Sequence, residues 1–161
     1  MDTAPHPRLR FAAFTVVAAA TAALAAWSSA SLALEVWVMF TGFIAWFSRP
    51  TAFRHSLAAM LCLWLGIALA ALAHRATGAL APALGSAALP GVVFAAGCVI
   101  VGLRATRGLD NMLAWFLGMV TFFAAGFGAT AEAFAHLGAA TAIGGLAGWT
   151  CQTVNRRWVE A

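Results

Sequence analysis

Charged residues are scarce in this sequence, and lysine and tyrosine are absent. Charged side chains make up 9% of the 161 residues, whereas hydrophobic ones make up 63%. A soluble globular domain carries about a quarter charged residues, so this chain has too little polar surface to stay dispersed in water. The composition therefore excludes an ordinary soluble domain and indicates a protein whose solvent is lipid.

Recognisable catalytic and metal-binding motifs are also missing from the sequence. The three cysteines, Cys62, Cys98 and Cys151, lie in or beside apolar runs, and no Cys-x-x-Cys pair occurs. The sequence has no phosphate-binding loop, no Ser/His/Asp arrangement and no paired carboxylates deep in an apolar run. We therefore expect no enzymatic activity, no cofactor and no metal site.

Six apolar runs account for most of the chain. They are residues 11–28, 36–47, 56–73, 89–103, 112–127 and 133–150. A helix needs about 20 apolar residues to cross the hydrocarbon layer, with roughly 17 as the lower end. The second, fourth and fifth runs are shorter, so they either thin the bilayer or form re-entrant segments sheltered by protein. We expect an all-α integral membrane protein, one domain over residues 1–161, with about six transmembrane helices. Four spans plus two re-entrant segments is the alternative.

The arginines predict the orientation of these helices. With six crossings and an internal N-terminus, only Arg75 falls outside. The arginines on the inner side are Arg8, Arg10, Arg49, Arg54, Arg104, Arg107, Arg156 and Arg157. This bias fits the positive-inside rule for short loops, so we expect a bacterial inner-membrane protein with both termini in the cytoplasm. Arginines scattered singly or in pairs between apolar runs also argue against nucleic-acid binding.

The first apolar run raises the question of a cleaved signal peptide, because it follows two arginines. The run is longer than a usual signal-peptide core, and the next apolar run begins almost at once. We therefore expect the first run to be retained as a helix.

A faint internal repeat relates the two halves of the chain. A shift of 76 residues places the run 36–47 on residues 112–123, so that Gly42 falls on Gly118 and two aromatic pairs coincide. Three crossings per half would give the halves, 1–76 and 77–161, opposite orientations. Inverted repeats recur in transporters, with the binding site at the interface between the halves. The alternative is a chance match between residues that are common in membrane helices.

Three segments of the chain carry a family resemblance. Residues 36–50 contain the pattern Gly-x-x-x-Trp-Phe-x-x-Pro, and residues 116–126 and 142–149 form two further apolar, glycine-containing segments. These segments resemble the signatures of a small bacterial inner-membrane family catalogued as domain of unknown function 1097. The resemblance implies a multi-pass membrane protein and leaves the activity open. Residues 113–116 are bulky where the family often has small residues. This difference argues against a pore lining shared with the family.

Two groups of residues are candidates for function. The first combines glycines and aromatic residues of the short runs, which could line a pore or the interface between the halves. These residues are Gly42, Phe43, Trp46, Trp115, Gly118 and Phe122. Aromatic rings in such a place could form a constriction that gates by dewetting. Ordinary helix packing and lipid contact are the alternatives.

The second group is polar and lies at the expected outer mouth. Glu35 precedes the second run, and Glu132 and His136 lie one helical turn apart, so that these two could pair. Glu35 and Asp110 could instead cap the helices that follow them. Separately, the small residues of Gly144-x-x-x-Gly148 predict close helix packing or a subunit contact.

Two functions fit these observations. One is a channel or facilitator for a small uncharged solute, because carboxylates for ion coupling are not evident within the membrane. The other is a non-transporting scaffold or modulator of a partner membrane protein. If Gly42 and Gly118 face a shared cavity, the channel is favoured, and if they face tight helix packing, the scaffold is favoured. In either case the expected partners are the lipid bilayer and a second copy of the chain.

Overall fold

The computed structural model describes residues 7–49 and 52–158, and all regular secondary structure in this part of the chain is helical. Six α-helices and two short 3₁₀ turns make up the fold. They are α1 (Pro7–Ser31), α2 (Val36–Phe47), α3 (Phe53–Leu84), η1 (Gly85–Ala87), α4 (Ala88–Gly102), η2 (Leu103–Ala105), α5 (Met112–Ala125) and α6 (Ala131–Trp158). The all-α prediction is therefore confirmed.

Helix α3 is the element that differs most from the sequence-based expectation. The predicted run ended at residue 73, but the helix continues to Leu84 and contains Pro82 in its last turn. Residues 76–81 are mostly alanine, leucine and glycine, and alanine and leucine favour helix strongly. Gly85, with a φ of 55°, then ends the helix, since glycine adopts this conformation without steric cost. The result is a long α3 joined tightly to α4 through η1.

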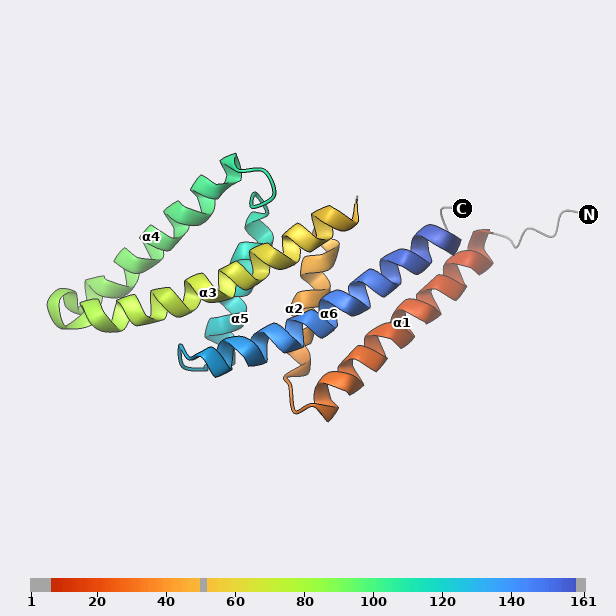
Figure 1. Ribbon diagram of the computed structural model, residues 1–161, viewed down its shortest axis with the longest axis horizontal. Coiled ribbons are helices and arrows are strands. Elements are labelled where there is room, and N and C mark those ends of the chain that lie inside the picture. The colour runs from red at the N-terminus through yellow and green to blue at the C-terminus, as the bar shows by residue number, and fades with distance from the viewer. Residues whose placement is uncertain (1–6, 50–51, 159–161) are drawn as a thin grey trace, which may run out of the picture.

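The helices form a layered bundle around two short central helices (Figure 1). α2 and α5 stand steeply in the middle, while α1, α3 and α6 are long and inclined. α2 packs mainly against α6, and α5 packs mainly against α3. α1 lies along α6, and α4 lies along α3. α1 begins and α6 ends at the same end of the bundle (Figure 1). The terminal residues 1–6 and 159–161, and the side chain of Arg8, lie outside the described part.

The four inner helices share one cluster of the core, and α4 and α1 each contribute to another. Val38, Ile67, Phe122 and Leu137, from α2, α3, α5 and α6 respectively, belong to one buried cluster. α1 and α4 lie at the periphery of this core, and they leave large apolar side chains exposed. Phe94 of α4, for example, is 74% exposed.

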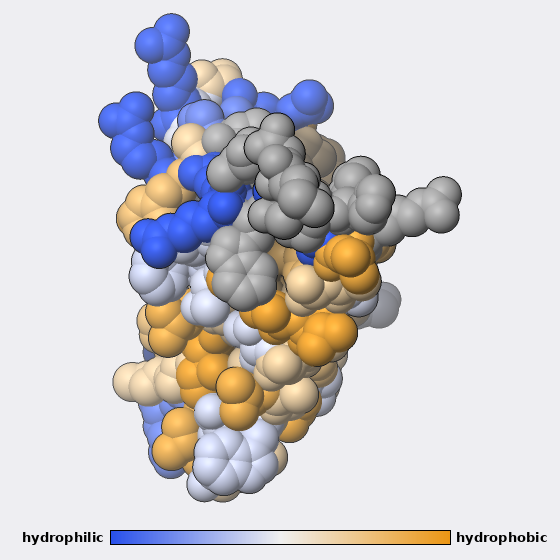
Figure 2. Space-filling model, turned by 90° about the vertical axis from the view of Figure 1, so that its right-hand side faces the viewer, coloured by the Kyte–Doolittle hydropathy of each residue, from blue (hydrophilic) through white to orange (hydrophobic). Residues whose placement is uncertain are grey.

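Among the described residues, two segments are long and apolar enough to cross a membrane, judged by length and composition. They are Leu9–Ser31 and the α3–α4 hairpin, Phe53–Ala105, while Val36–Phe47 and Met112–Ala125 are apolar but shorter. Figure 2 shows hydrophilic residues gathered mainly at the upper end of one face, with hydrophobic residues dominating its middle. Such a distribution suits a molecule whose middle contacts hydrocarbon and whose end contacts water.

Candidate functional site

The crossing of α2 and α6 brings two helix backbones into direct contact. A Cβ atom built at Gly42 would overlap the backbone carbonyl of Thr141, and one built at Gly144 would overlap the carbonyl of Met39. Gly148 extends the same interface, because a Cβ there would lie 2.8 Å from the Cβ of Trp46. Glycine is therefore required here for the close approach of the two helices.

The crossing of α3 and α5 has the same construction. A Cβ at Gly118 would overlap the carbonyl of Leu63, and a Cβ at Gly66 would overlap the carbonyl of Trp115. Gly42 and Gly118 thus both face tight helix packing, with backbone atoms occupying the space where a cavity would begin.

The two crossings use corresponding positions of the two halves. The matching positions are Gly42 with Gly118, Met39 with Trp115, Leu63 with Thr141, and Gly66 with Gly144. The offset is 76 residues for the short helices and 78 for the long ones. In each crossing the short helix of one half packs on the long helix of the other half.

The aromatic residues proposed for a constriction are distributed over separate clusters. Trp46, Trp115 and Phe122 are each at most 5% exposed, and each belongs to a different buried cluster. Phe43 packs against a fourth cluster and also against Phe47, and the centroids of these two rings are 5.1 Å apart. These rings therefore fill four parts of the core and do not meet around one axis.

Hydrogen bonds fix the orientation of the buried indoles. Trp46 donates from Nε1 to Oε1 of Gln152 at 3.0 Å, and Trp115 donates to the carbonyl of Leu109 at 2.9 Å. Because each indole N–H is satisfied, its ring can be buried without leaving an unpaired donor. The bond of Trp46 joins α2 to α6, and the bond of Trp115 joins α5 to the loop before it. Both tryptophans therefore have a packing role.

A contact between the side chains of His136 and Glu35 closes one end of the α2–α6 interface. Nε2 of His136 lies 2.6 Å from Oε2 of Glu35, and both side chains are about one-third exposed. The expected partner of His136 was Glu132, but that side chain is exposed and His136 turns toward the start of α2. Glu35 stands at the N-cap of α2 without a capping bond from its carboxylate, which is engaged by His136 instead. Glu35, Glu132 and His136 share a polar pocket of about 270 Å³.

At the opposite end of α2, where α5 begins, the side chains of Arg49 and Asp110 form an ion pair. Arg49 donates from both guanidinium nitrogens to the carboxylate of Asp110, at 2.8 and 2.9 Å. Arg49 lowers the pKa of Asp110 below its ordinary value, chiefly through these hydrogen bonds. Asn111, and not Asp110, caps α5 by accepting from the N–H of Ala114, and it also donates to Ser48 at 2.7 Å. The capping role expected for Asp110 was wrong because its carboxylate is held by Arg49.

Comparison with known proteins places the chain in a family. Residues 15–155 match the family described as "Protein of unknown function (DUF1097)". The chain belongs to this family. No curated protein and no solved structure matches it.

The part of the chain that matches DUF1097 contains both glycine crossings. It also contains the side-chain pairs Glu35–His136 and Arg49–Asp110. The Gly-x-x-x-Trp-Phe pattern of residues 42–47 has a structural reason. Gly42 admits α6, and Trp46, one turn later, packs over Gly148 of the same helix. The motif therefore describes a helix crossing.

Sequence reasoning missed the pairing of Arg49 with Asp110. From the sequence, Arg49 was used only to predict the orientation of the helices in the membrane. Asp110 was interpreted only as an N-terminal cap of the helix that follows it. Their separation of 61 positions gives no periodic signal, although a lone acid and a lone base at the ends of apolar runs are the residues most in need of partners.

Proposed function

We propose that this chain is a polytopic membrane protein with six crossings, embedded in the bacterial inner membrane. The inclined long helices and the exposed apolar side chains of α1 and α4 support this placement, because a water-soluble surface would leave them unfavourably hydrated. α2, at 12 residues, is about 18 Å long and shorter than the roughly 30 Å hydrocarbon layer. Its central position, sheltered by longer helices, makes such a short crossing tolerable.

The orientation that we propose has both termini in the cytoplasm. Arg49 lies at the end of the bundle where α2 ends and α5 begins, as do Arg104 and Arg107 in the segment before α5. Arg75 donates to the carbonyl of Ala129, in the connection between α5 and α6 at the other end. This division of the arginines supports the orientation by the positive-inside rule.

We further propose that the two halves, α1–α3 and α4–α6, are related by an inverted repeat. The matched glycine crossings support this relation, since each short helix packs on the long helix of the other half at corresponding positions. The small difference between the offsets, 76 and 78 residues, arises because α5, with 14 residues, is two residues longer than α2, with 12.

The function that the geometry supports best is that of a non-transporting scaffold or modulator of a partner membrane protein. The observation that carries this proposal is the filling of the helix crossings at Gly42 and Gly118 by backbone. In addition, both ends of α2 are joined to the other half by polar side chains, Glu35 to His136 and Arg49 to Asp110. A body that is packed and fastened in this way can present fixed helix faces to another membrane protein.

A facilitator for a small uncharged solute is the second candidate. The polar pocket around Glu35 and His136 favours it, because a polar mouth is the entrance that such a protein would need. Conduction would require the Glu35–His136 pair and the glycine crossings to separate.

Flux measurements distinguish the two functions. Purified protein in liposomes is tested by light scattering with water, glycerol, urea, ammonia and small amides. The scaffold proposal expects rates equal to those of empty liposomes for every solute. Rapid permeation of any one solute would overturn the scaffold and establish the facilitator.

A second arm of the experiment tests for a partner directly. A photo-crosslinking residue at Phe94, exposed on α4, should give a defined adduct with another polypeptide in native membranes. The same residue at Ile100, which is fully buried on the same helix, is the matched control and should give none. Adducts with lipid alone at several exposed positions of α1 and α4 would contradict partner binding.

A further inference from the structure

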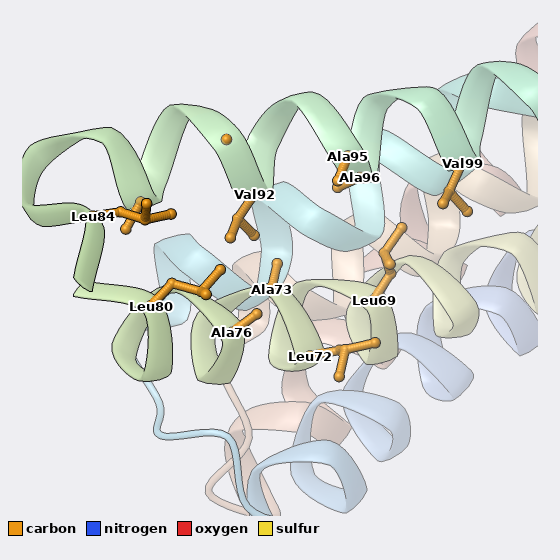
Figure 3. A pocket seen from close by; sticks show the side chains of 12 residues that line it. Leu69, Leu72, Ala73, Ala76, Leu80, Leu84, Val92, Ala95, Ala96 and Val99 are labelled. Carbon is orange, nitrogen blue, oxygen red and sulfur yellow. The ribbon is translucent and has the colours of Figure 1, made fainter. Parts of the chain in front are cut away.

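An apolar groove runs between α3 and α4 on the outside of the bundle. Its volume is about 510 Å³, and it is lined entirely by aliphatic side chains and glycine. Figure 3 shows Leu69 and Val99 at one end of the groove and Leu84 at the other. Between these ends, the side chains of residues such as Ala76 and Ala95 are too small to fill the space between the two helices.

The shape of the groove suits a single hydrocarbon chain. From Leu69 to Leu84 the groove follows α3 for about 22 Å at 1.5 Å per residue. A methylene chain is thin enough to lie along such a groove, because its carbons contact neighbours at about 3.5–4.0 Å.

The chemistry of the lining excludes water as the occupant. Ordered water needs two to four polar partners, and the side chains that line the groove offer none. An empty groove would leave the lining atoms without dispersion contacts on one side. In a bilayer, an acyl chain can fill the space without losing any hydrogen bond.

Positive charge lies beyond one end of the groove and is absent from the other. After Val99 the chain passes through η2, which carries Arg104, and then reaches Arg107, and both side chains are exposed. Arg104 lies five residues past Val99, about 7.5 Å along the axis at helical rise, which an arginine side chain and a lipid headgroup bridge easily. The opposite end, at η1 (Gly85–Ala87), has no charged residue.

We propose that the groove between α3 and α4 binds an acyl chain of an anionic phospholipid, with the phosphate held by Arg104 and Arg107. Basic sites at the cytoplasmic ends of membrane helices bind such headgroups. The groove then supplies contacts for the chain, and the arginines supply the preference for negative charge. This inference rests on the proposed bilayer placement and is independent of partner binding.

Gly91 allows a test of the groove that leaves the fold intact. A Cβ at Gly91 meets no atom within 4 Å, and this residue lines the groove, so Gly91→Leu should fill it without a clash. Gly97 is the matched control, because it lies on the same helix, is equally free of neighbours and is not part of the lining.

The experiment measures lipid retained by the detergent-purified protein, using native mass spectrometry after exposure to phosphatidylglycerol or phosphatidylcholine. We expect one retained phosphatidylglycerol per chain for the wild type and for Gly97→Leu, and a loss of at least tenfold in retention for Gly91→Leu. Each arginine contributes about fivefold, so Arg104→Gln with Arg107→Gln should lower the preference for phosphatidylglycerol by about 25-fold. Arg10→Gln, on α1, should leave the preference unchanged.

Two results would overturn the proposal. One is equal retention of both lipids by all variants, which would indicate unspecific annular lipid. The other is a wild-type dimer without retained lipid that Gly91→Leu converts to a monomer, because the groove would then be a contact between copies. Neither result depends on flux or crosslinking, so failure of the lipid site is distinguishable from failure of the proposed function.

Discussion

Replacing Gly42 by alanine tests one of the closest helix contacts in the described residues. The added methyl group would lie against the carbonyl oxygen, carbonyl carbon and Cα of Thr141, far inside the 3.4 Å at which ordinary contact begins. All three are backbone atoms, so no change of rotamer relieves the overlap. α2 and α6 must therefore move apart by about an ångström or more, and a gap of that size forfeits a quarter to a half of each dispersion contact along the interface.

The expected loss of stability follows from two opposing effects. Overpacking of a tight core costs about 1–3 kcal/mol, and we expect about 3 kcal/mol here because rigid backbone opposes the methyl group. Alanine regains about 1 kcal/mol over glycine through helix propensity. The net destabilisation of Gly42→Ala is then about 2 kcal/mol, which lowers Tm by about 4–8 °C in a chain of this size.

Gly138→Ala is the control for this substitution. Gly138 also lies in α6, but a Cβ there meets no atom within 4 Å. Only the gain in helix propensity remains, so the Tm should rise by about 2–4 °C. Gly118→Ala, at the matching position of the second crossing, should behave like Gly42→Ala.

The assay is thermal unfolding in detergent, followed by intrinsic tryptophan fluorescence. Trp46 and Trp115 lie at the two crossings, so their emission reports the separation of the helices. Equal melting temperatures for Gly42→Ala and Gly138→Ala would refute the close backbone contact and reopen a cavity at this crossing.

Two further predictions concern polar and thiol groups. The lowered pKa of Asp110 means that its pairing with Arg49 contributes fully above the ordinary value of 3.8 and is lost as the pH falls through the folded pKa. Tm should therefore drop more steeply below pH 4 for the wild type than for Asp110→Asn, and parallel profiles would contradict this. In detergent, N-ethylmaleimide should modify Cys98, which is exposed, well before Cys62 and Cys151, which are buried. Equal labelling rates for the three cysteines, measured by mass spectrometry, would contradict the burial of Cys62 and Cys151.

Part of the candidate site could be predicted because it depends on local sequence. α2 begins and ends at the predicted residues, since an unbroken apolar run between Glu35 and Arg49 leaves little choice. Gly144 and Gly148 were identified from sequence as packing residues, because small residues at helical spacing indicate close packing. Gly42 and Gly118 were identified as pore or interface residues, and Gly66 was missed. What they pack against could not be known, since neither Thr141 nor Leu63 differs in type from many other residues of its helix.

The partners of the charged residues depended on tertiary structure for a physical reason. The spacing of Glu132 and His136 allowed a local pair, but an exposed pair on one helix gains only a few tenths of a kcal/mol. Bringing the start of α2 beside α6 offered His136 the half-buried Glu35, 101 positions away in the chain. Such a choice is made only when the helices pack.

The sequence alone determined the helical class, the number and approximate extent of the helices and the family, because these follow from apolar runs and short motifs. Tertiary structure decided which helices touch and what lies between them. Each short helix packs on the long helix of the other half, and Gly42 and Gly118 face backbone. That arrangement depends on how the surfaces of distant helices fit together, and apolar helices of similar composition carry no local signal for it.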